Sequence, residues 1–147
     1  MQIRPGEVTD SVAIAALLIA LDYPVTPEFV AQGLQRQLTH ADAALLVAVE
    51  QDAVIGFISL HFIPQLALPG DFCRISYFCV DPEARGQGVG TALEMAASAL
   101  AQARGCDRIE VHCHSRREQA HRFYYRQGYG ESPKYLVKPA QPDEGGA

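Results

Sequence analysis

The feature that most restricts the fold of this chain is a run of alternating glycines, Gly86, Gly88 and Gly90, between a β-rich segment and an amphipathic helix. Glycine lets a backbone turn tightly and bring its N–H groups against a ligand without hindrance from a Cβ atom. The first turn of a helix has N–H groups without internal partners, and its dipole favours negative charge. A strand, a glycine loop and a helix N-terminus together therefore predict a binding site for a diphosphate.

The spacing of the glycines separates this loop from two common phosphate-binding loops. A nucleotide P-loop has the pattern G-x-x-x-x-G-K-[ST], which residues 86–91 do not contain. A dinucleotide-binding fold has the pattern G-x-G-x-x-G, which three alternating glycines do not satisfy. Neither of these nucleotide-binding folds is expected.

Two sequence blocks resemble the conserved motifs of one superfamily. The pattern Arg85-x-x-Gly88-x-Gly90 after a Val-x-Pro step resembles the acetyl-CoA motif of the GNAT superfamily of N-acetyltransferases. Residues 120–129, AHRFYYRQGY, are similar to its second conserved block, a helix with Phe-Tyr followed by Gly-Tyr. The likeness extends from about Gln2 to Lys138 and is greatest to small bacterial members of the aminoglycoside and aminoalkylphosphonate acetyltransferase type.

Hydrophobic periodicity predicts one α/β domain over residues 1–138 and a disordered Pro- and Gly-rich tail over 139–147. The expected strands are 3–4, 43–50, 54–63, 72–80, 108–113 and 135–138. The expected helices are 7–21, one that begins at Thr26-Pro27-Glu28, one after the glycine loop, and one between a capping box at 115–118 and Gly128. The order β-α-α-β-β-β-α-β-α-β, with room for a further strand, matches the GNAT arrangement of a mixed, mostly antiparallel twisted sheet flanked by helices.

Composition excludes several classes of protein. The net charge of −5 argues against nonspecific nucleic-acid binding, which needs a basic surface. No apolar run is long enough to span a membrane, and the N-terminus lacks the features of a secretion signal, so a cytoplasmic location is expected. The scattered cysteines at 73, 79, 106 and 113 are expected to be small buried hydrophobes, and no metal is expected.

The resemblance implies acetyl-CoA as cosubstrate. It places the pantetheine arm against the backbone at a bulge in the strand before the glycine loop, at Phe78, Cys79 and Val80. The pyrophosphate is expected to accept backbone N–H groups from the loop residues Gly86, Gln87, Gly88, Val89, Gly90 and Thr91. Arg85 is expected to add positive charge. Arg117 stands where many members carry an Asn that contacts CoA, so its expected partner is a phosphate.

Tyr124 occupies the position at which GNAT enzymes commonly place the tyrosine that protonates the departing CoA thiolate. A phenol with a pKa of about 10 suits that role as a positioned hydrogen-bond acid. The alternative role is core packing, because Tyr124 is one of several aromatic residues in this helix.

The general base is less clearly marked. The acceptor amine must lose a proton before it attacks the thioester. Many relatives carry an acid on the strand before the glycine loop, where this chain has Arg74, Ser76 and Tyr77. The remaining candidates are Glu110 or His112 on the neighbouring strand, or a chain of water molecules held by Ser76 and Tyr77.

The resemblance implies that the acceptor site is formed by the bend at 22–25 and the loop at 64–71. Asp22 or Asp71 is a candidate partner for an ammonium group, and Tyr23, Ser76 and Tyr77 complete the expected contacts. Neither segment contains an anion-binding cluster, which argues against a phosphonate substrate.

The expected function is direct transfer of an acetyl group, in a ternary complex, from acetyl-CoA to the primary amine of a small molecule. One alternative is acetylation of a protein or peptide N-terminus. Another is a non-catalytic module that senses acyl-CoA, which the missing acids at positions 76 and 77 favour. A homodimer is left open.

Overall fold

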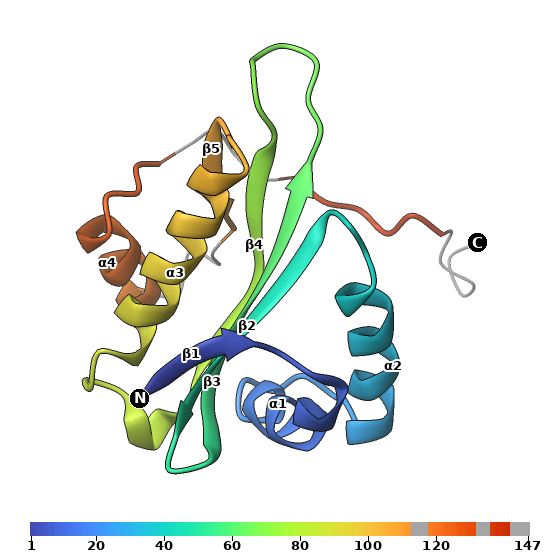
Figure 1. Ribbon diagram of the computed structural model, residues 1–147, viewed down its shortest axis with the longest axis vertical. Coiled ribbons are helices and arrows are strands. Elements are labelled where there is room, and N and C mark those ends of the chain that lie inside the picture. Colours follow the sequence, from blue (N-terminus) through green and yellow to red (C-terminus); the bar gives the residue numbers. More distant parts are fainter. Residues whose placement is uncertain (113–117, 132–135, 142–147) are drawn as a thin grey trace. The chain divides into compact units, whose positions relative to one another are not determined.

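The computed structural model describes residues 1–112, 118–131 and 136–141, which belong to two compact units. The first unit, Met1–Val111, contains most of the secondary structure (Figure 1). In chain order its elements are β1 (Gln2–Pro5), η1 (Val8–Asp10), α1 (Ser11–Ile19), α2 (Pro27–Leu38), β2 (Ala43–Glu50), β3 (Ala53–Ile63), β4 (Phe72–Val80), η2 (Pro82–Ala84), α3 (Val89–Ala103) and β5 (Arg108–Val111). The second unit, His112–Ala147, contains α4 (Glu118–Arg126).

The strands of the first unit form one sheet in the order β1-β2-β3-β4-β5. Neighbouring strands are antiparallel except for β4 and β5, which are parallel. The predicted mixed, mostly antiparallel sheet is therefore confirmed. The turn between β2 and β3 places Gln51 and Asp52 at positive φ, a conformation typical of a two-residue hairpin loop.

Several predicted element boundaries needed correction. The helix expected over 7–21 is divided into η1 and α1, because the Asp10 carboxylate accepts the Glu7 N–H (2.8 Å) and closes a separate first turn. The strand expected at 135–138 is absent over Leu136–Lys138. Leu136 and Val137 are largely exposed there, so no apolar face is buried that would stabilise a strand. Residues 113–117 and Tyr135, including the expected capping box, lie outside the described residues.

The α1 and α2 helices pack on one face of the sheet. Thr26 caps α2 as predicted, since its hydroxyl accepts the Phe29 N–H at 3.1 Å. The apolar residues of these helices contribute to a buried cluster with strand residues. The fully buried members are Ile14, Ala15, Leu17, Val30, Leu34, Leu45, Val47, Phe57 and Cys79.

A bidentate ion pair ties β1 to the start of the helical region. Arg4 donates to both carboxylate oxygens of Asp10, at 3.0 and 2.9 Å. The pairing with Arg4 lowers the pKa of Asp10, although the carboxylate is buried. Its charge is thereby kept at neutral pH, and α1 begins at a defined place beside the sheet.

Helix α3 approaches the sheet very closely at Gly56 on β3. A Cβ atom built on Gly56 would lie 3.1 Å from the Cys79 carbonyl oxygen and 3.2 Å from the side chains of Val89 and Leu93. Because Val89 is the first residue of α3, this contact sets the position of the helix N-terminus. The absence of a side chain at Gly56 is therefore a packing requirement.

We predict that Gly56→Ala lowers the free energy of unfolding by about 1–3 kcal/mol, since the new methyl group overpacks the contact with α3. The matched control is Gly33→Ala within α2, where an added Cβ meets nothing within 4 Å. That control should raise stability by about 0.5–1 kcal/mol through helix propensity. Urea unfolding of both variants checks the prediction, and equal effects of the two substitutions would contradict it.

Candidate functional site

The glycine loop has the backbone geometry that the sequence predicts. Gly86 and Gly88 both adopt φ of +80°, which L side chains rarely reach, and a Cβ atom on either would meet nothing within 4 Å. Gly88 is the N-cap of α3, and the first hydrogen bond of this helix runs from the Ala92 N–H to the Gly88 carbonyl oxygen at 3.0 Å. The amides of Val89 and Gly90 therefore precede the helical ladder and point out of the helix N-terminus.

The loop is anchored to the sheet at its beginning. The Asp81 N–H donates to the Ile55 carbonyl oxygen at 2.8 Å, and the Asp81 carboxylate accepts the Glu83 N–H at 2.9 Å. Val89 is buried on the other side of the loop, whereas Arg85 and Gln87 between them are exposed. The result is an exposed backbone loop that is held at both ends, a geometry that suits an anionic ligand.

Strand β4 has a bulge at Ser76. The register of β3 with β4 passes from Ser59 opposite Tyr77 directly to Leu60 opposite Ile75. Ser76 is therefore an extra residue, and it lies on the same sheet face as Tyr77 instead of the opposite face. The pairing of β4 with β5 ends at Ile75 and Val111, immediately before this bulge. The predicted bulge thus exists, but it lies before residues 78–80.

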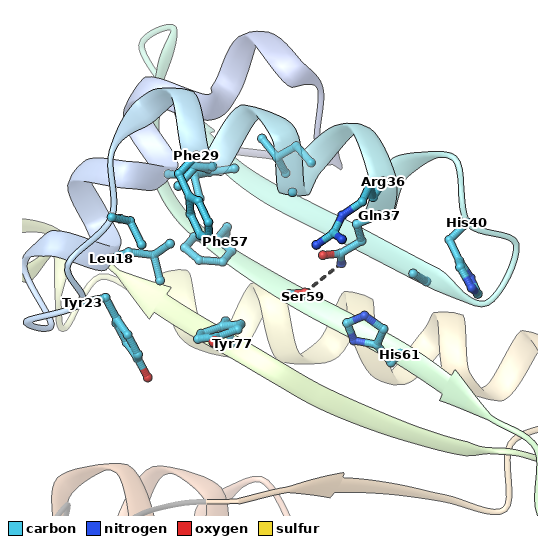
Figure 2. A pocket seen from close by; sticks show the side chains of 16 residues that line it. Leu18, Tyr23, Phe29, Arg36, Gln37, His40, Phe57, Ser59, His61 and Tyr77 are labelled. Atoms are coloured by element: carbon cyan, nitrogen blue, oxygen red, sulfur yellow. Dashed lines mark hydrogen bonds between the residues drawn. The ribbon is translucent and has the colours of Figure 1, made fainter. Parts of the chain in front are cut away.

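On the face covered by α1 and α2, a cavity of about 500 Å³ opens above β3 and β4 (Figure 2). Its walls come from both helices, the bend between them, and the strands. The lining residues are Ile14, Leu18, Tyr23, Val25, Phe29, Val30, Gly33, Leu34, Arg36, Gln37, His40, Ala43, Phe57, Ser59, His61 and Tyr77. Its size is typical of a pocket for a small molecule.

The polar side chains of the cavity lie together at one end (Figure 2). Gln37 donates from its side-chain amide to Ser59 Oγ at 2.7 Å and to the Ala44 carbonyl oxygen at 3.0 Å, which links α2 to the strands. His61 Nδ1 is hydrogen-bonded to Ser76 Oγ. The bulge therefore supplies the residue that orients the imidazole ring.

His61 is half-buried beside this polar end of the cavity. Burial lowers the pKa of His61 from its usual 6.5, and positive charge at His40 and Arg74 lowers it further. The imidazole is consequently neutral near pH 7 and has one ring nitrogen with an accessible lone pair. Sequence patterns alone did not identify His61, although its place two residues after Ser59 on one strand predicts a shared face.

Only some of the residues predicted to bind the acceptor lie at the cavity. Tyr23 and Tyr77 both line the cavity, with ring centroids 5.5 Å apart in a T-shaped contact. Ser76 reaches the cavity through His61. Asp22 and Asp71 are not among the described lining residues, and the Asp71 carbonyl oxygen accepts the Asp107 N–H (2.8 Å).

The two predicted base candidates occupy different surroundings. Glu110 forms an ion pair with Arg74, with Arg74 Nη2 donating to its carboxylate at 2.9 Å. This contact occupies the Glu110 carboxylate with a fixed cation. His112 follows the end of β5 and is exposed. The Ser76 hydroxyl, which was a candidate to hold a chain of water molecules, is hydrogen-bonded to His61.

In the second unit, Tyr124 is buried on α4. Its ring makes T-shaped contacts with Phe123 and with Tyr129, both at 5.4 Å between centroids. The Tyr129 N–H donates to the Tyr124 carbonyl oxygen at 3.0 Å, which closes the end of the helix around the ring. Arg117 lies outside the described residues.

No group of three or more His, Cys, Asp or Glu side chains is placed to hold a metal ion in the part of the chain that the structure describes. Among the same residues, no helix has the length and apolar character needed to cross a membrane. Cys73 and Cys79 are buried, as expected, and burial raises the pKa of the Cys73 thiol to about 12.

The family model and the known proteins that match this sequence are all acetyltransferases. The model of the acetyltransferase (GNAT) family matches residues 14–129. The aminoalkylphosphonate N-acetyltransferase of Salmonella typhimurium is 29% identical over 136 residues, covering 89% of this chain and 86% of that protein. The aminoglycoside N(6')-acetyltransferase type 1 of Klebsiella aerogenes is 32% identical over 114 residues, covering 71% of this chain and 72% of that protein.

Solved structures confirm the predicted fold class. A crystal structure described as a transcriptional regulator from Bacillus halodurans C-125 superposes with a TM-score of 0.87 at 22% sequence identity. The match covers 94% of this chain and 98% of that one. At this identity the likeness concerns the fold alone.

Proposed function

Because this chain belongs to the acetyltransferase (GNAT) family, we propose that it transfers an acetyl group from acetyl-CoA to the primary amine of a small molecule held in the cavity. The observation that carries this proposal is the course of β4. Its bulge at Ser76 and Tyr77 borders the cavity, and its C-terminal end leads directly into the glycine loop. One strand thus connects the acceptor site to the site for the cosubstrate.

The glycine loop binds the pyrophosphate of acetyl-CoA in this proposal. Backbone N–H groups at the start of α3 donate to the phosphate oxygens, and the exposed Arg85 adds a positive charge. The pantetheine arm follows the backbone of β4 at residues 78–80, toward the bulge. The reacting thioester is thereby brought to the end of the strand segment that borders the cavity.

The acceptor is a primary amine because the similar proteins share that chemistry. One is named for aminoalkylphosphonates and the other for aminoglycosides. These acceptors differ in charge and shape, but each presents an amino group to be acetylated. Transfer is direct, in a complex that holds both substrates.

His61 accepts the proton that the ammonium group must lose. It borders the cavity beside Ser59, and its Nδ1 is hydrogen-bonded to Ser76 Oγ. In the proposed tautomer Nδ1 carries the proton, which leaves the Nε2 lone pair for the substrate. Glu110 is a weaker candidate because Arg74 already pairs with its carboxylate. His112 lies exposed after β5.

The reaction then balances with two side chains. The ammonium group first loses one proton to His61, which releases it to water. The neutral amine nitrogen then bonds to the carbonyl carbon of the thioester and gives a second proton to His61 as the C–S bond breaks. This second proton returns through water to the Tyr124 oxygen after Tyr124 has protonated the sulfur. The departing sulfur takes a proton from the Tyr124 hydroxyl, the role that the sequence predicts. The ring contacts with Phe123 and Tyr129 support this assignment, because they restrict the side chain of Tyr124.

We predict that Gly88→Val abolishes the thermal stabilisation that CoA produces, because a branched side chain at a φ of +80° distorts the loop and blocks phosphate approach. Gly105→Val is the matched control. Gly105 has a φ of +72° and an equally open Cβ direction, but it follows the opposite end of α3. The control should lower the melting temperature and retain the CoA-dependent increase. Undiminished stabilisation in Gly88→Val would rule out the loop as the binding site.

A second prediction concerns Tyr124→Phe. The substitution keeps the ring and its aromatic contacts, so CoA affinity should change little, while turnover falls by about a hundredfold or more with the loss of the proton donor. Tyr129→Phe alters the ring that contacts Tyr124 and should leave turnover nearly unchanged. Turnover, CoA affinity and melting temperature are measured on both variants. Near-normal turnover of Tyr124→Phe would assign the residue to packing.

A third prediction separates His61 from the other base candidates. The acid limb of the kcat/KM profile should follow the pKa of His61, which lies below 6.5 because the buried imidazole resists protonation. His61→Gln should lower turnover by about 10²- to 10⁴-fold and remove this limb. Ser76→Ala should move the limb while retaining substantial turnover, since it frees the ring without removing it. NMR titration of His61 gives the reference value, and an unchanged limb in His61→Gln would transfer the role to Glu110 or His112.

A further inference from the structure

The charge of the cavity lining restricts the acceptor more narrowly than family membership does. Among the described lining residues there is no Asp or Glu, whereas Arg36 contributes a guanidinium group. A pocket that selects a polyamine or an amino sugar needs carboxylates to balance several ammonium groups. This cavity offers the opposite charge.

Like Arg85 in the glycine loop, Arg36 is an exposed arginine of the first unit without an ion-pair partner among the described residues, but Arg36 lines the cavity. Within the described residues, ion pairs join Arg4 to Asp10, Arg74 to Glu110, Arg104 to Asp42 and Arg108 to Asp107. Arg36 forms no such pair with any residue that the structure describes. A guanidinium at this place in the last turn of α2 is favourable to the helix dipole. That role, however, does not require it to project toward the cavity, as it does in Figure 2.

The opposite end of the cavity is apolar. Leu18, Val25, Phe29 and Phe57 line it, beneath the bend between α1 and α2. Phe29 is 66% exposed although it is a large apolar residue beside a pocket, so a bound apolar group would remove its ring from water. The cavity is thus suited to a ligand with one apolar end and one polar end.

We infer that the acceptor is an amine of the α-amino acid type, with an anionic group beside the amine and an apolar side group. This inference rests on the proposed function. Arg36 binds the anion with two parallel N–H donors, a geometry that matches a carboxylate or a phosphonate. The side group fills the apolar end.

The position of the amine follows from the same arrangement. Figure 2 places Arg36 and Gln37 on α2 across from Ser59 and His61 on β3, at one end of the cavity. An amine next to the anion therefore lies near the proposed proton acceptor when the anion contacts Arg36. A simple amine without the anion has no such anchor, and the positive charge of Arg36 opposes its ammonium group.

The test compares matched acceptors that differ only in the anion. Phenylalanine and 2-phenylethylamine share the ring and the amine, and 1-amino-2-phenylethylphosphonate replaces the carboxylate. We expect kcat/KM to be higher for the two anionic acceptors than for 2-phenylethylamine. Arg36→Gln should lower kcat/KM about 10- to 100-fold for the anionic acceptors and leave 2-phenylethylamine unchanged or improved.

Two further variants act as controls. Arg36→Lys keeps the charge but loses the paired donors, so it should recover part of the lost kcat/KM. Arg108→Gln removes an exposed arginine outside the cavity and should not change the preference. Calorimetry of phenylalanine with the protein–CoA complex supplies a readout without turnover, and binding should weaken in Arg36→Gln by a similar factor.

The outcomes separate this inference from the proposed function. Efficient acetylation of 2-phenylethylamine or spermidine with none of the anionic acceptors would overturn the inference and leave the acetyltransferase intact. An equal loss for all three matched acceptors in Arg36→Gln would also overturn it. Failure to acetylate any of these amines, together with CoA-dependent stabilisation, would overturn the proposed function and the inference with it.

Discussion

The antiparallel ladder of β3 and β4, interrupted at Ser76, is the constraint on which the rest of the site depends. A regular ladder would send Ser76 and Tyr77 to opposite faces of the sheet. The bulge directs both toward the face of α1 and α2, where Tyr77 borders the cavity and Ser76 holds His61. The same ladder fixes Gly56 opposite Val80, where close packing of α3 sets the beginning of the glycine loop helix.

This arrangement separates two electrostatic environments across one sheet. At the end of β4, backbone N–H groups at a helix N-terminus favour negative charge. In the cavity, Arg36 provides positive charge without a described acid, and burial lowers the pKa of His61.

Local patterns predicted the elements that depend on local chemistry. Strands β2 and β4 have the predicted bounds, and Thr26 caps α2 as its hydroxyl suggested. Prediction failed where a single side-chain hydrogen bond or the lack of a burying neighbour decides the structure. Asp10 divided an expected helix through its bond to the Glu7 N–H, and apolar residues near 136–138 formed no strand because no neighbour buries them. Acids in the predicted acceptor segments, Asp22 and Asp71, do not line the cavity.

The sequence by itself determined the family, the order of the main elements and the glycine loop, because these depend on residue spacing along the chain. It also singled out Tyr23 and Tyr77, both of which line the cavity. Only the tertiary structure brought His61 to Ser76, and Arg36 to the cavity that His61 borders. These residues come from different elements, and their proximity depends on a bulge and on helix packing. The charge of the cavity lining could not be predicted from the segments 22–25 and 64–71, because the lining side chains come from several elements that meet only in the fold.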